Sequence, residues 1–147
     1  DIRRGRTYMY FRGEPQYPFG YGLSYTTFAW ERLRTSAASM GRDGAIDVSV
    51  DVRNTGTREG DEVVQLYVRY PGSKVERPLK QLRGFARATL RPGETRTVTL
   101  RLPASDLAYW DPARHAWVVE PGQVELMVGR SSADADLTLK QMVTVTP

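Results

Sequence analysis

Strict alternation of apolar and polar residues begins near residue 45 and is the feature that most limits how this chain folds. Across residues 46–53, isoleucine or valine occupies every even position, and aspartate, serine or arginine occupies every odd position. Successive side chains of a strand point to opposite faces, so this period predicts a strand with one buried and one solvated face. Asn54-Thr55-Gly56 is expected to end it, because asparagine and glycine tolerate positive φ in turns.

Further strand-like segments follow, separated by glycine, proline and asparagine turns roughly every ten residues. The seven expected strands cover residues 45–53, 62–70, 79–90, 95–102, 117–119, 123–128 and 137–145. The second has apolar residues on both faces, which predicts a central or doubly covered strand. Arg91-Pro92-Gly93-Glu94 favours a type II turn, and Ser105-Asp106-Leu107 permits a short helical turn. This spacing predicts an all-β fold, an antiparallel β-sandwich of about seven strands that supplies its own core from residue 45 onward.

Residues 1–30 have a different character. They hold nine of the fifteen aromatic residues (8 Tyr, 4 Phe and 3 Trp in all), interrupted by glycines and prolines, and show neither a helical nor a strand period. Exposing so many aromatic rings to water is costly, so this irregular aromatic arm is expected to lie against a surface. The arm either wraps its own domain or contacts a neighbour, and direct ligand contact by its rings is the less favoured alternative.

Composition excludes several classes of protein. The length of 147 residues fits one domain with an appendage, and the lack of cysteine excludes disulfides and thiolate metal sites without fixing a cellular compartment. No segment reaches the roughly 18 apolar residues of a membrane helix, so no membrane partner is expected. The net charge of +4 comes from basic residues spread along the chain, which argues against a nucleic-acid partner.

Residues for metal or nucleophilic catalysis are scarce. His115 is the only histidine and lies in a polar stretch between two expected strands, where a solvated turn residue is the favoured interpretation. Paired carboxylates would serve glycoside hydrolysis, but 17 acidic residues make some close pair inevitable. Asp61, Glu62, Asp134 and Asp136 are interpreted as turn and edge residues. The sequence therefore predicts no catalytic residue, no metal site and no cofactor.

A family resemblance becomes visible at Tyr17-Pro18-Phe19-Gly20-Tyr21-Gly22-Leu23-Ser24-Tyr25-Thr26-Thr27-Phe28. This segment resembles the signature of glycoside hydrolase family 3, the β-glucosidases and β-xylosidases, where the α/β-sandwich domain joins a C-terminal fibronectin type III-like domain. Further matches occur in the family's order, and they are Gly5 to Phe11, Asn54-Thr55-Gly56, Gly60 to Val68, Leu82-Arg83-Gly84-Phe85, Leu90 to Glu94 and Val119-Glu120-Pro121-Gly122.

The resemblance implies an immunoglobulin-like, fibronectin type III-like sandwich at residues 31–147, preceded by a linker arm at residues 1–30. In the family, the catalytic aspartate and glutamate lie upstream of this region, so no catalytic residue is carried over. The implied partners are the barrel and α/β-sandwich domains of a parent β-glycosidase. The resemblance assigns interdomain docking to eight arm residues, which are Tyr17, Pro18, Phe19, Gly20, Tyr21, Gly22, Leu23 and Tyr25.

Two functions therefore remain as alternatives. The leading one is a non-catalytic accessory domain that supports the stability and cleft architecture of a family 3 glycosidase. The alternative is a carbohydrate-binding module that uses aromatic residues of the loops or the arm, although the sequence offers no clear aromatic strip on one sheet face. An independent enzyme is disfavoured, because neither family carboxylate lies within the chain.

Overall fold

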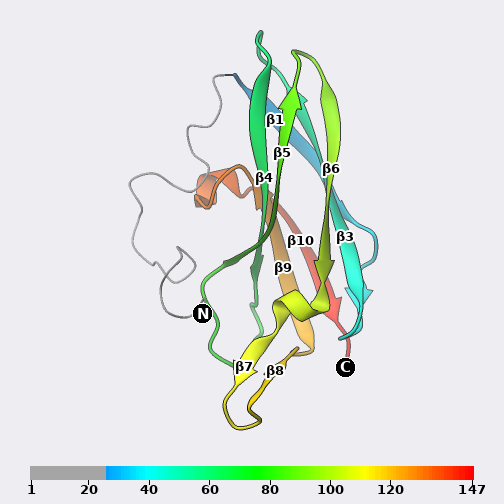
Figure 1. Cartoon of the computed structure of the whole chain (residues 1–147), viewed down its shortest axis with the longest axis vertical. Helices are drawn as coiled ribbons and strands as arrows, with labels where there is room; N and C mark the ends of the chain where they lie inside the picture. The colour runs from blue at the N-terminus through cyan, green and yellow to red at the C-terminus, as the bar shows by residue number, and fades with distance from the viewer. Residues whose placement is uncertain (1–25) are drawn as a thin grey trace.

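The computed structural model describes residues 26–147, which form a β-sandwich with a projecting hairpin (Figure 1). The eight arm residues assigned to docking lie outside the described residues. The strands are β1 (Phe28–Thr35), β2 (Ser39–Met40), β3 (Ala45–Asn54), β4 (Gly60–Arg69), β5 (Gln81–Leu90), β6 (Thr95–Pro103), β7 (Tyr109–Asp111), β8 (Ala116–Val118), β9 (Gly122–Gly129) and β10 (Leu139–Val145). Two 3₁₀ turns join them, η3 (Ala104–Leu107) and η4 (Asp134–Asp136).

Two sheets make up the sandwich. Three strands form one sheet in the order β1-β3-β6, and five form the other in the order β2-β10-β9-β4-β5. All pairings are antiparallel except the short contact of β2 with β10, which is parallel. Strands β7 and β8 pair only with each other and extend beyond the sheets (Figure 1). The expected antiparallel sandwich is confirmed, and each of the seven expected strands is present.

Residues 26–147 contain ten strands, so the expectation of about seven was too low. Strands β2 and β7 span two and three residues, too few to show a period. Strand β1 is longer, but its register shifts between Glu31 and Arg34, and Arg32 adopts φ 60°. This bulge interrupts the alternation by which a strand is recognised. Because β1 begins at Phe28, the last residues of the range expected for the arm belong to the sandwich.

The core lies between the sheets and follows the alternation in the sequence. The even positions of β3 (Ile46 to Val52) are almost completely buried and face the apolar side chains of β4 and β9. Burying each such side chain contributes about 1.5–3 kcal/mol to folding. Phe28, Trp30 and Leu33 of β1 pack against this cluster. The core therefore includes side chains from before residue 45, and an independent fold from residue 45 onward stays a prediction.

Strand β4 is covered on both faces, as its sequence predicts. It lies between β5 and β9, and its outer face carries Tyr67 in a second small cluster with Met127 and Leu137. Leu137 belongs to the segment around η4, orange in Figure 1, which lies beside β4. At Gly129 an added Cβ would collide with the backbone of Asp136, so only glycine permits this close approach.

Candidate functional site

The end of the sandwich where the described chain enters is held by one asparagine. Asn54 is fully buried, and its side chain uses its whole hydrogen-bonding capacity. The amide Nδ2 donates to the carbonyls of Arg58 (2.8 Å) and Leu90 (2.9 Å). Its Oδ1 accepts from Thr26 Oγ1 (3.1 Å) and from the Gly56 N–H (2.9 Å). Asn54 thus joins the chain that enters β1, the end of β5 and the β3–β4 turn.

The expected turn at Asn54 is present, but its chemistry differs from the prediction. Among the described non-glycine residues only Arg32 and His115 have positive φ, so Asn54 acts through its side chain rather than a left-handed backbone. Its backbone also donates to Glu94 O (2.9 Å) and accepts from Gly93 N–H (2.8 Å). Gly93 itself has φ 78° and Glu94 N–H donates to the carbonyl of Arg91 (3.0 Å), which confirms the predicted type II turn.

Two glycines let the entering chain lie tightly against this end. A Cβ on Gly56 would collide with Thr26 Oγ1, and a Cβ on Gly60 would collide with Thr26 Cγ2. Thr27 continues the attachment, because its hydroxyl bonds the hydroxyl of Thr55 (2.8 Å) and its carbonyl accepts from the Thr55 N–H (2.9 Å). The chain is therefore fixed in position before β1 begins.

Glu62 is buried rather than at an edge, so its interpretation as a turn or edge residue is wrong. It lies on central strand β4, is 1% exposed and lines a cavity of about 290 Å³ together with Phe28 and Trp30. Burial raises the pKa of its carboxyl, with partial opposition from the charge of Arg130. Oε2 lies 3.8 Å from Arg130 Nε, and neither atom has a hydrogen-bond partner among the described residues.

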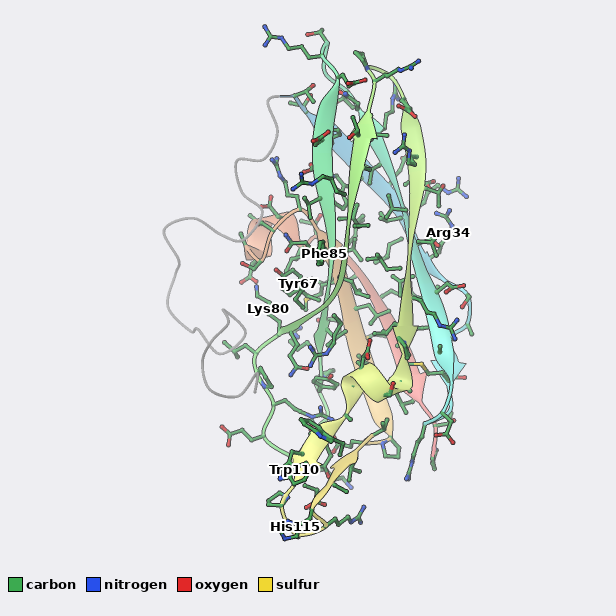
Figure 2. All side chains as sticks on the ribbon, in the orientation of Figure 1. Arg34, Tyr67, Lys80, Phe85, Trp110 and His115 are labelled. Carbon is green, nitrogen blue, oxygen red and sulfur yellow. The ribbon has the colours of Figure 1, made fainter. Side chains whose placement is uncertain are left out.

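The other three acidic residues considered have local structural contacts. Asp61 accepts a hydrogen bond from Thr89 (2.6 Å), and Asp136 accepts one from Ser131 (2.6 Å). Asp134 lies in η4 and pairs with Lys80 at 2.8 Å (Lys80 is labelled in Figure 2). Within residues 26–147, no group of three or more His, Cys, Asp and Glu side chains is arranged to hold a metal ion.

The opposite end of the sandwich carries aromatic residues on the β7–β8 hairpin. Trp110 and Trp117 are directly paired, with ring centroids 5.7 Å apart in an edge-to-face arrangement. Trp117 is nevertheless 59% exposed. Figure 2 shows Trp110 on the hairpin and His115 at its tip. His115 is exposed with φ 51°, which confirms its interpretation as a turn residue.

The loop that follows β4 is held against this hairpin by a buried ion pair. Arg77 is 6% exposed at its side chain, contacts Glu120 at 3.3 Å and donates to the Leu107 carbonyl (3.0 Å). Its guanidinium lies over the rings of Tyr70 (3.9 Å) and Tyr109 (5.0 Å).

Glu120 fixes the same loop by accepting hydrogen bonds from two more groups. Ser73 Oγ donates to Oε1 (2.7 Å), and the Lys74 N–H donates to Oε2 (2.9 Å). Burial opposes ionisation of Glu120, but these bonds and the Arg77 guanidinium outweigh it and hold the pKa below its usual value. The loop is therefore bonded to the chain that leaves the hairpin.

A pocket of about 330 Å³ lies between this loop and the hairpin. Its wall combines the rings of Trp110 and Trp117 with the polar groups of Glu76, Gln81 and Asp111. Sequence reasoning missed this site, because it treated the stretch around His115 only as a turn. The available signal was the placement of two tryptophans on either side of that turn.

Comparison with known proteins gives concordant matches. Residues 62–132 match the family described as a fibronectin type III-like domain. The chain is 47% identical over 121 residues to a β-glucosidase of Rhizobium radiobacter, covering 82% of this chain and 15% of that protein. It is 44% identical over 135 residues to a xylan 1,4-β-xylosidase of Xylanibacter ruminicola, covering 91% of this chain and 15% of that protein.

Solved structures agree with these relatives. The structure of β-glucosidase 3B from Thermotoga neapolitana in complex with α-D-glucose matches with a TM-score of 0.82 at 39% identity, over 95% of this chain and 19% of that one. A β-glucosidase of Bifidobacterium adolescentis matches with the same TM-score at 35% identity, over 94% of this chain and 20% of that one. The chain thus spans about a fifth or less of these relatives.

No helix among residues 26–147 is both long and apolar enough to cross a membrane.

Proposed function

Because this chain is a fibronectin type III-like domain of the kind carried by family 3 β-glucosidases and β-xylosidases, we propose that it acts as a docking domain. It holds a fixed position on the barrel and α/β-sandwich domains of a parent β-glycosidase. In that position it stabilises the enzyme and supports the shape of its substrate cleft. Catalysis is left to the other domains.

The fixed entry of the chain carries this proposal. Thr26 is hydrogen bonded to Asn54 and enclosed by Gly56 and Gly60, so the first described residue is held in place on the sandwich. A module on a flexible tether needs a mobile linker immediately before its first strand. A rigid attachment instead transmits the orientation of the sandwich to whatever precedes it.

The arm supplies the contact in this proposal. Tyr17, Phe19, Tyr21, Leu23 and Tyr25 fill the interface, while Pro18, Gly20 and Gly22 shape the backbone around them. Aromatic side chains are typical anchors of protein interfaces because each buries a large area.

Exposed apolar residues on the described surface offer a second contact for the same partner domains. Phe85 on edge strand β5 is 64% exposed, and Leu79 just before that strand is 52% exposed. Large apolar side chains exposed on a surface can mark an interaction site. Arg83 lies beside Phe85 in a shallow hollow that Leu82 and Asp106 also line, and arginine is enriched in interfaces.

Insertion of Gly-Ser-Gly-Ser between Tyr25 and Thr26 of the intact glycosidase tests docking. We expect the unmodified enzyme to unfold in one calorimetric transition and the insertion to make the sandwich melt separately. The same insertion between Ala113 and Arg114, at the hairpin tip, is the control and should keep the single transition. An unmodified enzyme whose sandwich already melts separately, at the midpoint of the isolated chain, would contradict docking.

A further inference from the structure

The pocket at the hairpin end has the features of a small-molecule site. It is concave, has aromatic walls and holds a few polar groups, the combination that distinguishes ligand pockets from ordinary surface. We propose that it binds a neutral oligosaccharide, with one pyranose ring stacked on the indole of Trp117. This site lies at the opposite end from the entry of the chain, so it adds to docking and does not compete with it (Figure 1).

The position of Trp117 supports stacking. Its ring is 59% exposed, yet the edge-to-face contact with Trp110 at 5.7 Å fixes how it lies. An aromatic platform whose orientation is already set loses little conformational freedom when a ligand covers it. The flat C–H face of a sugar ring can stack on such an indole, as the faces of other planar ligands do.

The charges around the pocket favour a neutral ligand with many hydroxyls. Glu76 presents a carboxylate, which accepts hydrogen bonds from hydroxyl groups and repels anions, and Asp111 adds a second carboxylate whose charge is paired with Arg114 at 3.6 Å. The Asp111 carboxylate is oriented by the Ala113 N–H, which donates to Oδ1 at 2.9 Å. The buried guanidinium of Arg77 is paired with Glu120, so its charge is neutralised.

The far wall of the pocket is built to stay in place. Arg77 lies between loop and hairpin, over the ring of Tyr109 and against Glu120. A largely buried charged pair stabilises little by itself but favours one specific arrangement through its hydrogen bonds, here those of Arg77 to Glu120 and to the Leu107 carbonyl. Here the arrangement that it fixes is the wall of the pocket, so the site exists before a ligand arrives.

Titration of the 147-residue chain with cellohexaose and with xylohexaose tests the site. The choice of β-linked glucose and xylose chains rests on the proposed function. We expect saturable heat in calorimetry with at least one of the two, and a change in tryptophan fluorescence with the same midpoint. Trp117→Ala should weaken binding by about tenfold or more, and Trp117→Tyr should restore part of it.

Phe85→Ala is the matched control, since Phe85 is equally exposed but lies midway along the sandwich, away from the hairpin (Figure 2). It should leave the affinity unchanged. Absence of saturable binding to both sugars, or equal weakening by Phe85→Ala and Trp117→Ala, would overturn the proposal. So would loss of the single melting transition of the intact glycosidase in Trp117→Ala, because the pocket would then be a contact for another domain. Docking itself is judged separately by the linker insertion.

Discussion

The two ends of this sandwich use polar and aromatic residues in opposite ways. At the entry end the important groups are buried, and Asn54 satisfies every hydrogen-bonding position of its side chain inside the protein. At the hairpin end the buried pair of Arg77 and Glu120 supports an exposed ring, Trp117. At the entry end, buried hydrogen bonds therefore fix the position of the chain. At the hairpin end, an aromatic surface stays exposed for a ligand. Substitutions should accordingly affect stability at the first end and binding at the second.

The sharpest test of this contrast is Asn54→Ala. The substitution removes four side-chain hydrogen bonds and leaves the buried carbonyl of Leu90 without its amide donor, so we expect a loss of about 3 kcal/mol in the free energy of unfolding. Urea denaturation of the isolated chain measures it. Arg53→Ala, the exposed neighbour on the same strand, should change stability by less than about 0.5 kcal/mol. Equal effects of the two variants would show that the entry end does not depend on Asn54.

Glu62 is expected to have a smaller effect on the free energy of unfolding, and this effect depends on pH. Burial raises the pKa of this carboxyl above its ordinary value of 4.5, so the folded protein binds the proton more tightly than the unfolded chain. The stability contributed by the neutral acid is complete below pH 4.5 and is lost as the pH rises through the folded-state pKa. Glu62→Gln should remove this loss and become stabilising, relative to the unmodified chain, as the pH rises to neutrality.

Asp51 contributes to stability with the opposite pH dependence, and Asp51→Asn tests this contribution. The hydrogen bond from Thr97 and the charges of Arg34 and Arg32 lower the pKa of Asp51, despite its burial. Its contribution is present above its ordinary pKa of 3.8 and is lost as the pH falls. Denaturation across the pH range should therefore give opposite slopes for the two contributions. Parallel slopes would contradict the assignment of a buried, hard-to-ionise acid at position 62.

The smallest change in the free energy of unfolding is expected for a substitution at the tip of the hairpin. His115 has φ 51°, a conformation that glycine adopts without steric cost. His115→Gly should raise the free energy of unfolding by less than about 1 kcal/mol and leave the pocket intact. Ala113→Gly in the same turn, where φ is not positive, should lower it slightly. A destabilising His115→Gly would show that the imidazole has a structural contact.

The fold was predictable from the sequence where alternation was complete. Residues 46–52 revealed β3 because every even side chain faces the core, and Arg91 to Glu94 revealed their turn because proline and glycine have restricted or unusual φ. Strand β1 was not recognised, since the bulge at Arg32 shifts its register.

The site was less predictable than the fold. The burial of Glu62 depends on which residues β1 and β10 place over it, and such packing leaves no local period. The hairpin pocket likewise forms between residues 75–78 and 108–117, whose proximity comes only from the fold. The docking role of the arm stays a prediction, because its residues lie outside the described part of the chain.

The order of strands in the larger sheet also has a consequence for synthesis. Strand β10 is the last in the sequence, yet it lies between β2 and β9 in the sheet. A ribosome delivers the chain from its first residue onward, so β2 and the β9-β4-β5 group stay separated until Leu139–Val145 emerges. Until then β9 lacks its antiparallel neighbour at one edge, and Trp30 of β1 in the opposite sheet lacks the β10 side chain Leu139 beside it. Under the docking proposal, an upstream domain would complete its own fold before this sandwich closes, and docking would be the last step in assembling the enzyme.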